Sequence, residues 1–123
     1  MFVVKLIMTR EEKDLVLQDL CGRLPYGVKC KHKLSDYKEV LDGIKHENAF
    51  CYFIDCEPCL VEDIKPYLFP MSSMTDEQKT EWDYIDYYAD HHEAVDWLNK
   101  NHFDYRGLID MGLALDATGL NIY

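Results

Sequence analysis

Three helix-start signals divide the chain and limit the folds that are open to it. The segments Thr9–Glu12, Thr75–Gln78 and Asp90–Glu93 each place a capping residue three positions before a Glu or Gln, which is the pattern of a capping box. They predict helices over residues 10–23, 75–87 and 90–101. All four prolines of the chain lie between residues 25 and 70, and proline disfavours helix interiors. The middle of the chain is therefore expected to form strands.

Four segments of this middle region have strand character. Residues 28–34 alternate between lysine and less polar side chains, and residues 49–54 form a continuous apolar and aromatic run. Residues 37–44 contain Asp42-Gly43, which favours a turn or bulge, and residues 60–67 form a short strand ended by Pro66 and Pro70. Beyond the third helix, Asp104 is expected to cap a last short helix that runs to Met111.

This order of elements predicts an α+β fold. We expect one domain over residues 1–123, with a small antiparallel sheet of three or four strands packed against N-terminal and C-terminal helices. Residues 1–8 are expected to form a strand or a flexible arm. The predicted core is Leu17, Leu20, Leu24, Val28, Cys30, Phe50, Tyr52, Ile54, Trp97, Leu98, Phe103 and Leu108.

Charge is distributed unevenly along the chain. The formal net charge is -10. Residues 71–123 carry a net charge of -8, with three basic and eleven acidic side chains. Such a balance disfavours direct binding to nucleic acid and to anionic membranes, because both need clustered cations. Basic protein surfaces or cations are the natural electrostatic partners of the second half.

The cysteine pattern favours a reducing compartment. There are five cysteines, an odd number, and the apolar opening segment is short, contains Lys5 and lacks the layout of a secretory signal. We therefore expect a cytoplasmic protein whose five thiols are free. Cys56 and Cys59 are expected to flank a turn at Pro58 and to oxidise first.

Three segments carry a resemblance: Leu24–Val28, Ile64–Thr75 and Asp96–Ile109. On these the chain resembles a family of small uncharacterised proteins of gut anaerobes and of the phages and mobile elements that infect them. Its members share a proline-tyrosine-glycine turn, a KPYLRPMSSMT-like segment and a DWLNxxHFDYRGLI-like segment. Phe69 stands where that pattern has Arg. The resemblance implies an intracellular, phage or mobile-element context and implies no activity, cofactor or catalytic residue.

Two groups of residues raise the alternative of a metal-dependent enzyme or metal-binding protein. Cys51, Cys56 and Cys59 have the first three positions of a plant-type iron–sulfur spacing, but no cysteine follows them. His92 and Asp96 lie four residues apart on one helix with His91 beside them, but a third ligand or a nucleophile is not identifiable. We expect no enzyme, no metal and no cofactor.

Lys29, Lys31 and Lys33 form a positive stripe on one strand face. A nucleic-acid-binding sheet would add further basic residues and exposed aromatic residues to such a stripe. We interpret the stripe as protection of an edge strand against association with other sheets.

The remaining candidate site lies between Asp76 and Asp96, where eight carboxylates are interleaved with four large aromatic side chains. A run of acids is usually a solvated helix face, yet aromatic anchors inside an anionic rim are typical of protein-binding surfaces. The sequence therefore predicts a non-enzymatic module that binds a basic protein surface; an acidic mimic of nucleic acid is a further alternative. The predicted binding residues are Asp83, Tyr84, Asp86, Tyr87, Tyr88 and Asp90.

Overall fold

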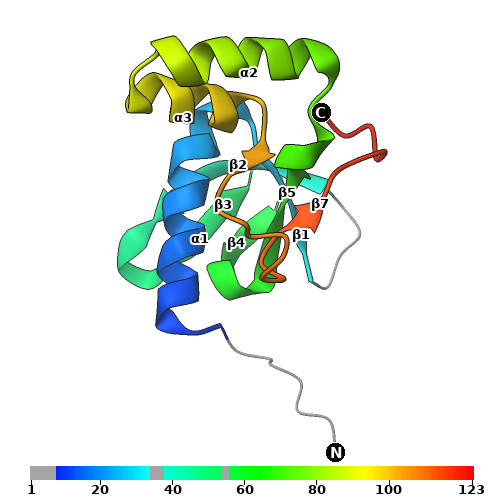
Figure 1. Ribbon diagram of the computed structural model, residues 1–123. Coiled ribbons are helices and arrows are strands. Elements are labelled where there is room, and N and C mark those ends of the chain that lie inside the picture. Colours follow the sequence, from blue (N-terminus) through cyan, green and yellow to red (C-terminus); the bar gives the residue numbers. More distant parts are fainter. Residues whose placement is uncertain (1–7, 34–37, 54–55) are drawn as a thin grey trace, which may run out of the picture. The chain divides into compact units, whose positions relative to one another are not determined.

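The computed structural model describes residues 8–33, 38–53 and 56–123 (Figure 1). The chain forms two compact units, residues 1–66 and residues 67–123. Each unit is described separately, and the prediction of a single domain stays a prediction. The arm expected over residues 1–8 falls outside the described residues except for Met8.

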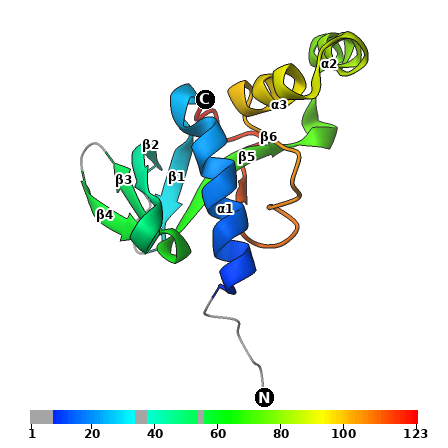
Figure 2. The ribbon, with the colours of Figure 1, turned by 90° about the vertical axis from the view of Figure 1, so that its left-hand side faces the viewer.

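The first unit is a helix and an antiparallel sheet. The strands lie in the order β4-β3-β2-β1-β5, and each neighbouring pair is antiparallel. Figure 2 shows α1 running along one face of these strands. The elements are α1 (Arg10–Arg23), β1 (Lys29–His32), β2 (Lys38–Lys45), β3 (Phe50–Phe53), β4 (Cys56–Leu60) and the first half of β5 (Ile64–Pro70). Single 3₁₀ turns occupy Leu24–Tyr26, His46–Asn48 and Val61–Asp63.

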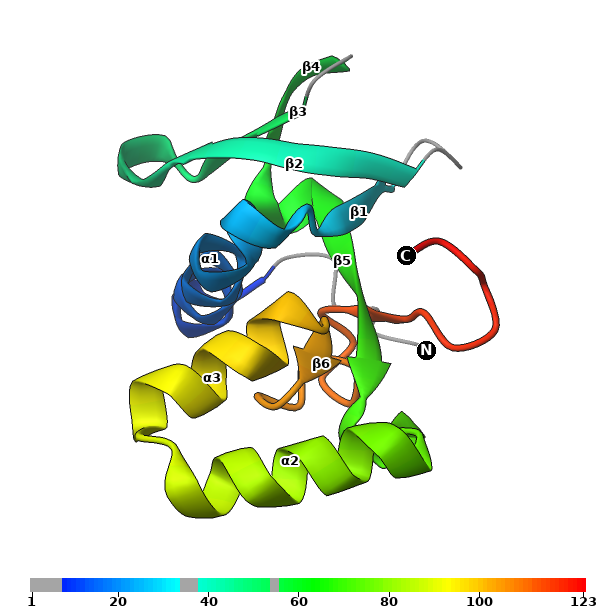
Figure 3. The ribbon, with the colours of Figure 1, turned by 90° about the horizontal axis from the view of Figure 1, so that it is seen from above.

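The second unit consists of two helices and short parallel pairings with the second half of β5. Phe69 of β5 pairs with Phe103 of β6, and Tyr67 of β5 pairs with Leu115 of β7. The elements are a 3₁₀ turn (Met71–Ser73), α2 (Asp76–Tyr88), α3 (His91–Lys100), β6 (Phe103–Asp104) and β7 (Leu115–Asp116). Figure 3 shows α2 lying alongside α3.

The three predicted helices are confirmed, and their capping residues explain where they begin. In α1 the Glu12 N–H donates to Thr9 Oγ1 at 3.1 Å, and the Thr9 N–H donates to Glu12 Oε1 at 2.9 Å. Thr75 and Gln78 make the same reciprocal pair at the start of α2. The start of α3 is fixed by Asp90 alone, whose Oδ1 accepts the Glu93 N–H at 2.8 Å. These bonds satisfy amides that have no partner within the helix.

The α+β class is confirmed, but the predicted sheet is too small. Seven strands pair in the described part of the chain, and the pairings of β5 with β6 and β7 are parallel. Strands β6 and β7 have two residues each, too few to produce a periodic pattern in the sequence. These two strands form because they pair with β5, and their own residues do not predict them.

Two prolines lie inside strands where the sequence suggested turns or strand ends. Pro58 belongs to β4, which is the terminal strand of the sheet, so one of its sides needs no ladder partner. Pro66 belongs to β5 and pairs with Cys30, whereas the ladder with β7 begins only at Tyr67. Among the described strands, each of these two prolines thus has a neighbour on one side only. The predicted turn at Pro58 and the predicted strand end at Pro66 are wrong.

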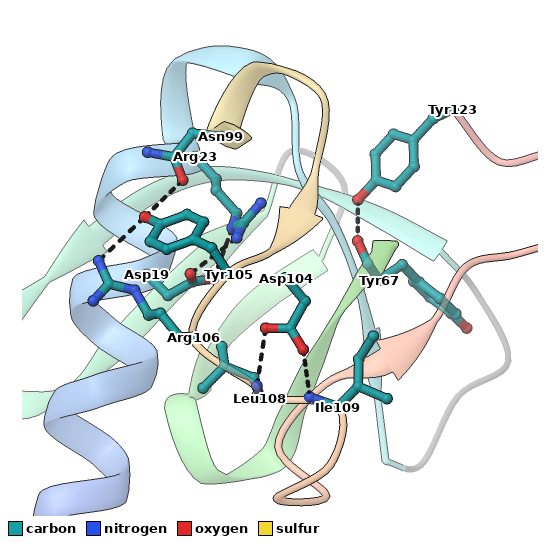
Figure 4. A network of polar contacts seen from close by, with 10 residues as sticks. All are labelled: Asp19, Arg23, Tyr67, Asn99, Asp104, Tyr105, Arg106, Leu108, Ile109 and Tyr123. Atoms are coloured by element: carbon teal, nitrogen blue, oxygen red, sulfur yellow. Dashed lines mark hydrogen bonds and ion pairs between the residues drawn. The ribbon is translucent and has the colours of Figure 1, made fainter. Parts of the chain in front are cut away.

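The short helix expected over residues 104–111 is absent from this described segment, in which Asp104 ends β6 and the residues after it form turns. The Asp104 carboxylate accepts the N–H groups of Leu108 and Ile109, both at 2.9 Å (Figure 4). Gly107, which lies between Asp104 and Leu108 in the sequence, has a φ of 77°. This is a left-handed conformation that an α-helix does not contain. Asp104 is therefore a capping residue, as predicted, but it caps a turn.

Most of the predicted core is confirmed, and seven of its members are buried: Leu17, Leu20, Val28, Cys30, Leu98, Phe103 and Leu108. Three others, Leu24, Phe50 and Trp97, are half-buried. The prediction that Tyr52 is a core residue is wrong, because Tyr52 is 36% exposed while Cys51 and Phe53 are buried. Among the described residues of the first unit, α1 covers one face of the sheet, and alternate residues of the apolar run point to opposite faces. Ile54 lies outside the described residues.

The core of the first unit also contains an ion pair that the sequence analysis did not identify. Asp19 and Arg23 lie one turn apart on α1, and both side chains are 0% exposed. Arg23 Nε donates to Asp19 Oδ2 at 2.8 Å, and Arg23 Nη2 donates to Asp19 Oδ1 at 3.1 Å (Figure 4). The signal was present in the sequence, because these residues share the helical stripe of Val16 and Leu20.

Candidate protein-binding surface

Helix α2 contacts its own unit along one narrow side. Trp82 stacks on Trp97 of α3 with ring centroids 5.6 Å apart and packs against the buried cluster of Met74, Leu98 and Phe103. No residue of α2 is fully buried. The aromatic residue Trp82 therefore packs against the core of the second unit, and most of the other α2 residues are exposed.

The three tyrosines at the end of α2 form one exposed aromatic surface. Tyr84 is 66% exposed, Tyr87 is 80% exposed and Tyr88 is 69% exposed. The ring centroids of Tyr84 and Tyr88 are 4.8 Å apart, and those of Tyr87 and Tyr88 are 4.7 Å apart in an edge-on arrangement. These are favourable geometries for aromatic pairs. The three residues, called the tyrosine cluster below, contact one another and remain exposed to solvent.

Carboxylates surround the tyrosine cluster. Asp83 and Asp86 are exposed on α2, and residues 80–99 contain no Lys or Arg. Asp90 is exposed too, but α2 ends at Tyr88 and Ala89 has an extended backbone. Asp90 therefore does not continue the helical face of Asp83 and Tyr87, and it serves as the cap of α3.

A shallow depression on α2 extends this surface toward the start of the helix. Its lining residues are Glu77, Thr80, Glu81, Tyr84 and Ile85. The sequence analysis did not single out this group, although their i, i+3, i+4, i+7, i+8 spacing is that of one helix face. Tyr84 belongs both to the depression and to the tyrosine cluster, so the two features form one continuous surface.

The described candidate metal ligands do not form a group of three. His91, His92 and Asp96 are exposed on α3. Within residues 8–33, 38–53 and 56–123, no three His, Cys, Asp or Glu side chains are placed to hold a metal ion. Cys51 lies directly opposite Cys59 on the neighbouring strand, and the side chain of Cys56 is outside the described part. Burial, followed by the nearby thiols of Cys59 and Cys21, raises the pKa of Cys51 to about 12, so this thiol stays protonated near neutral pH.

The interpretation of the lysine stripe as edge protection is wrong. Strand β1 has β2 on one side and β5 on the other, so it lies in the interior of the sheet. The Lys33 ammonium forms an ion pair with Asp63 at 2.8 Å, and this pair raises the Lys33 pKa. Lys29 and Lys31 need a different explanation.

Comparison with models of known protein families, with curated proteins and with solved structures finds no match. None of the helices in the described part is long and apolar enough to cross a membrane.

Proposed function

We propose that this chain is a non-enzymatic, cytoplasmic protein-binding module, encoded by a phage or mobile element, whose acidic face of α2 binds a basic surface on another protein. The observation that carries the proposal is the tyrosine cluster. Its three side chains are each at least 66% exposed and contact one another. Contiguous exposed aromatic side chains are unusual on a monomer and are typical of interaction sites.

The surrounding charge indicates the kind of partner. Asp83 and Asp86 flank the tyrosines, and the segment 80–99 supplies no cation to neutralise them. A basic partner would be attracted over about one Debye length, near 8 Å at physiological salt. Its Lys and Arg side chains would pair with the carboxylates and stack on the tyrosine rings. Electrostatics would then govern the association rate, and desolvated tyrosines would supply most of the affinity.

Affinity capture from the native cell, followed by titration with the purified partner, tests this proposal. The variant Tyr84→Ala, Tyr87→Ala, Tyr88→Ala should weaken binding by roughly 100-fold or more, since buried interface tyrosines commonly contribute over 1 kcal/mol each. The matched control is Met111→Ala, Leu120→Ala, which removes two exposed apolar side chains of the same unit. The control should bind as the wild type does, and raising the salt concentration should slow association. Equal binding by the tyrosine variant and the wild type would place the surface elsewhere.

A further inference from the structure

The exposed face of the first unit's sheet carries lysines in direct cross-strand register. Lys31 of β1 lies opposite Lys38 of β2 on one side and opposite Lys65 of β5 on the other. Residues directly opposite one another project from the same face, and Lys29, two residues from Lys31, shares it. These four residues are called the lysine array below. Neighbouring strands are about 4.8 Å apart and alternate residues along a strand about 6.7 Å apart, so the backbone positions of these lysines form a close grid.

The lysine array destabilises the sheet as long as nothing of opposite charge is bound to it. Like charges placed directly opposite one another destabilise a strand pair. In the part of the chain that the structure describes, no carboxylate lies within 4.0 Å of the ammonium groups of Lys31, Lys38 or Lys65. Lys38 and Lys65 are exposed. A local cost of this kind is expected where a surface binds something of opposite charge.

An exposed aromatic ring lies on the same face. Leu41 of β2 and Phe53 of β3 are paired and buried, so Tyr52, the neighbour of Phe53, faces the other way together with Lys38. Tyr52 is 36% exposed and pairs with Gly43. A Cβ at Gly43 would lie 3.9 Å from the Cβ of Tyr52 and 4.0 Å from its ring Cδ2. Because glycine supplies no side chain, this side of the tyrosine ring is left uncovered by β2.

We infer that the lysine array and Tyr52 form a binding site for single-stranded nucleic acid. The array supplies cations for successive phosphates, and the tyrosine supplies a platform on which an unpaired base can stack. Both features that a nucleic-acid-binding sheet adds to a lysine stripe are therefore present. A duplex fits less well, because its bases are stacked internally and cannot reach the ring. The site shares no residue with the acidic face of α2 and does not depend on the function proposed for that face.

The net charge of the chain does not oppose this assignment. Of the formal charge of -10, -8 belongs to residues 71–123. Residues 1–66 carry only -2, with ten basic and twelve acidic side chains. The expectation against nucleic acid came from the excess of acidic over basic residues along the sequence, most of it in residues 71–123, whereas screening at physiological salt limits the reach of each charge to about 8 Å. The array itself consists of four basic residues.

Fluorescence anisotropy of the full chain with a labelled oligo(dT) of about 15 nucleotides tests the site, since one binding fold covers about 4–16 nucleotides. Four lysines at phosphates predict that log Kobs falls with log salt with a slope of about -3. The variant Lys31→Gln, Lys38→Gln, Lys65→Gln should reduce the magnitude of that slope by about 2. It should also remain folded by circular dichroism, because it relieves like-charge repulsion. Tyr52→Ala should weaken binding about 10-fold and leave the slope unchanged.

The control is Lys79→Gln, Lys100→Gln, which removes two exposed lysines of the second unit and should bind as the wild type does. The Tyr84→Ala, Tyr87→Ala, Tyr88→Ala variant should also bind the oligonucleotide normally, so a failure of either proposal is seen separately. The inference is overturned if oligo(dT) does not bind in low salt or if the control variant weakens binding as much as the array variant. It is also overturned if polyglutamate competes as well as oligo(dT), which would indicate an acidic protein ligand.

Discussion

At the scale of single residues, the Asp19–Arg23 pair is the feature of the first unit whose burial carries the largest desolvation cost. Both side chains are completely buried, and they are joined by two hydrogen bonds. Removing two charges from water is costly, and the attraction between them offsets this cost only while both are present. The pair is thus weak evidence for added stability, and because both residues lie on α1 it does not itself join the helix to the sheet.

Asp19→Asn should destabilise the chain by about 3–5 kcal/mol, because it leaves the Arg23 guanidinium buried without its counter-charge. Urea unfolding followed by circular dichroism measures the change. The double variant Asp19→Leu, Arg23→Met, which replaces the pair with apolar side chains, should recover most of the loss. A single variant as stable as the wild type would show that water reaches this site.

The buried thiol of Cys51 makes stability sensitive to alkaline pH. Its pKa is raised from the ordinary value of 9.0 to about 12, chiefly by burial. Folding therefore favours the protonated thiol, and its contribution is complete below pH 9.0 and is lost as the pH rises from 9.0 to about 12. The free energy of unfolding should fall by up to about 1.4 kcal/mol per pH unit in this window.

Urea titrations at a series of pH values across this window measure that slope. Lysine and tyrosine side chains also titrate there, so the informative quantity is the difference from a Cys51→Ala variant. That variant should be less stable near neutral pH and should show a shallower decline. Identical slopes in the two proteins would mean that the Cys51 thiol ionises normally in the folded state.

At the scale of elements, α2 has two sides with different roles. Trp82 lies against Trp97 and the buried cluster around Phe103, whereas the tyrosine cluster is exposed. The helix is therefore held by one aromatic side chain and exposes three others. The sequence supplied all four but did not reveal which of them was structural.

Trp82→Ala should lower the free energy of unfolding by about 2 kcal/mol or more, since it removes a half-buried aromatic packing contact. Tyr84→Ala should change it by less than about 0.5 kcal/mol, as is usual for exposed positions. Parallel urea titrations of the two variants measure the difference. Similar losses in both would show that the tyrosines stabilise the fold, which would weaken the case for a binding role.

Some properties of the strands could be predicted from local residues, and others could not. The strand over Lys38–Lys45 and its irregularity near Gly43 followed from local residues, and the register shifts there. The position of β1 inside the sheet could not be predicted from local residues, because contacts between distant residues decide which strands become neighbours. The lysine stripe was therefore noted from the sequence, but its meaning changed once β2 and β5 were found on its two sides.

At the scale of the whole molecule, the strongly negative net charge conceals two surfaces of opposite sign. The acidic face of α2 belongs to the second unit, and the lysine array belongs to the first. Counting charges along the chain located the acidic surface correctly, because its residues are close together in sequence. The lysine array is assembled from three strands between residues 29 and 65, so counting could not find it.

The sequence by itself determined the three helices, their capping residues and the α+β class. Helix caps and helical periodicity depend on residues within four positions of one another, so they can be read along the chain. Only the tertiary structure decided the size of the sheet, the burial of Asp19 with Arg23, the outward position of Tyr52 and the register of Lys31 with Lys38 and Lys65. Each of these depends on which distant segments become neighbours, and that choice is made by packing of the whole chain rather than by local propensity.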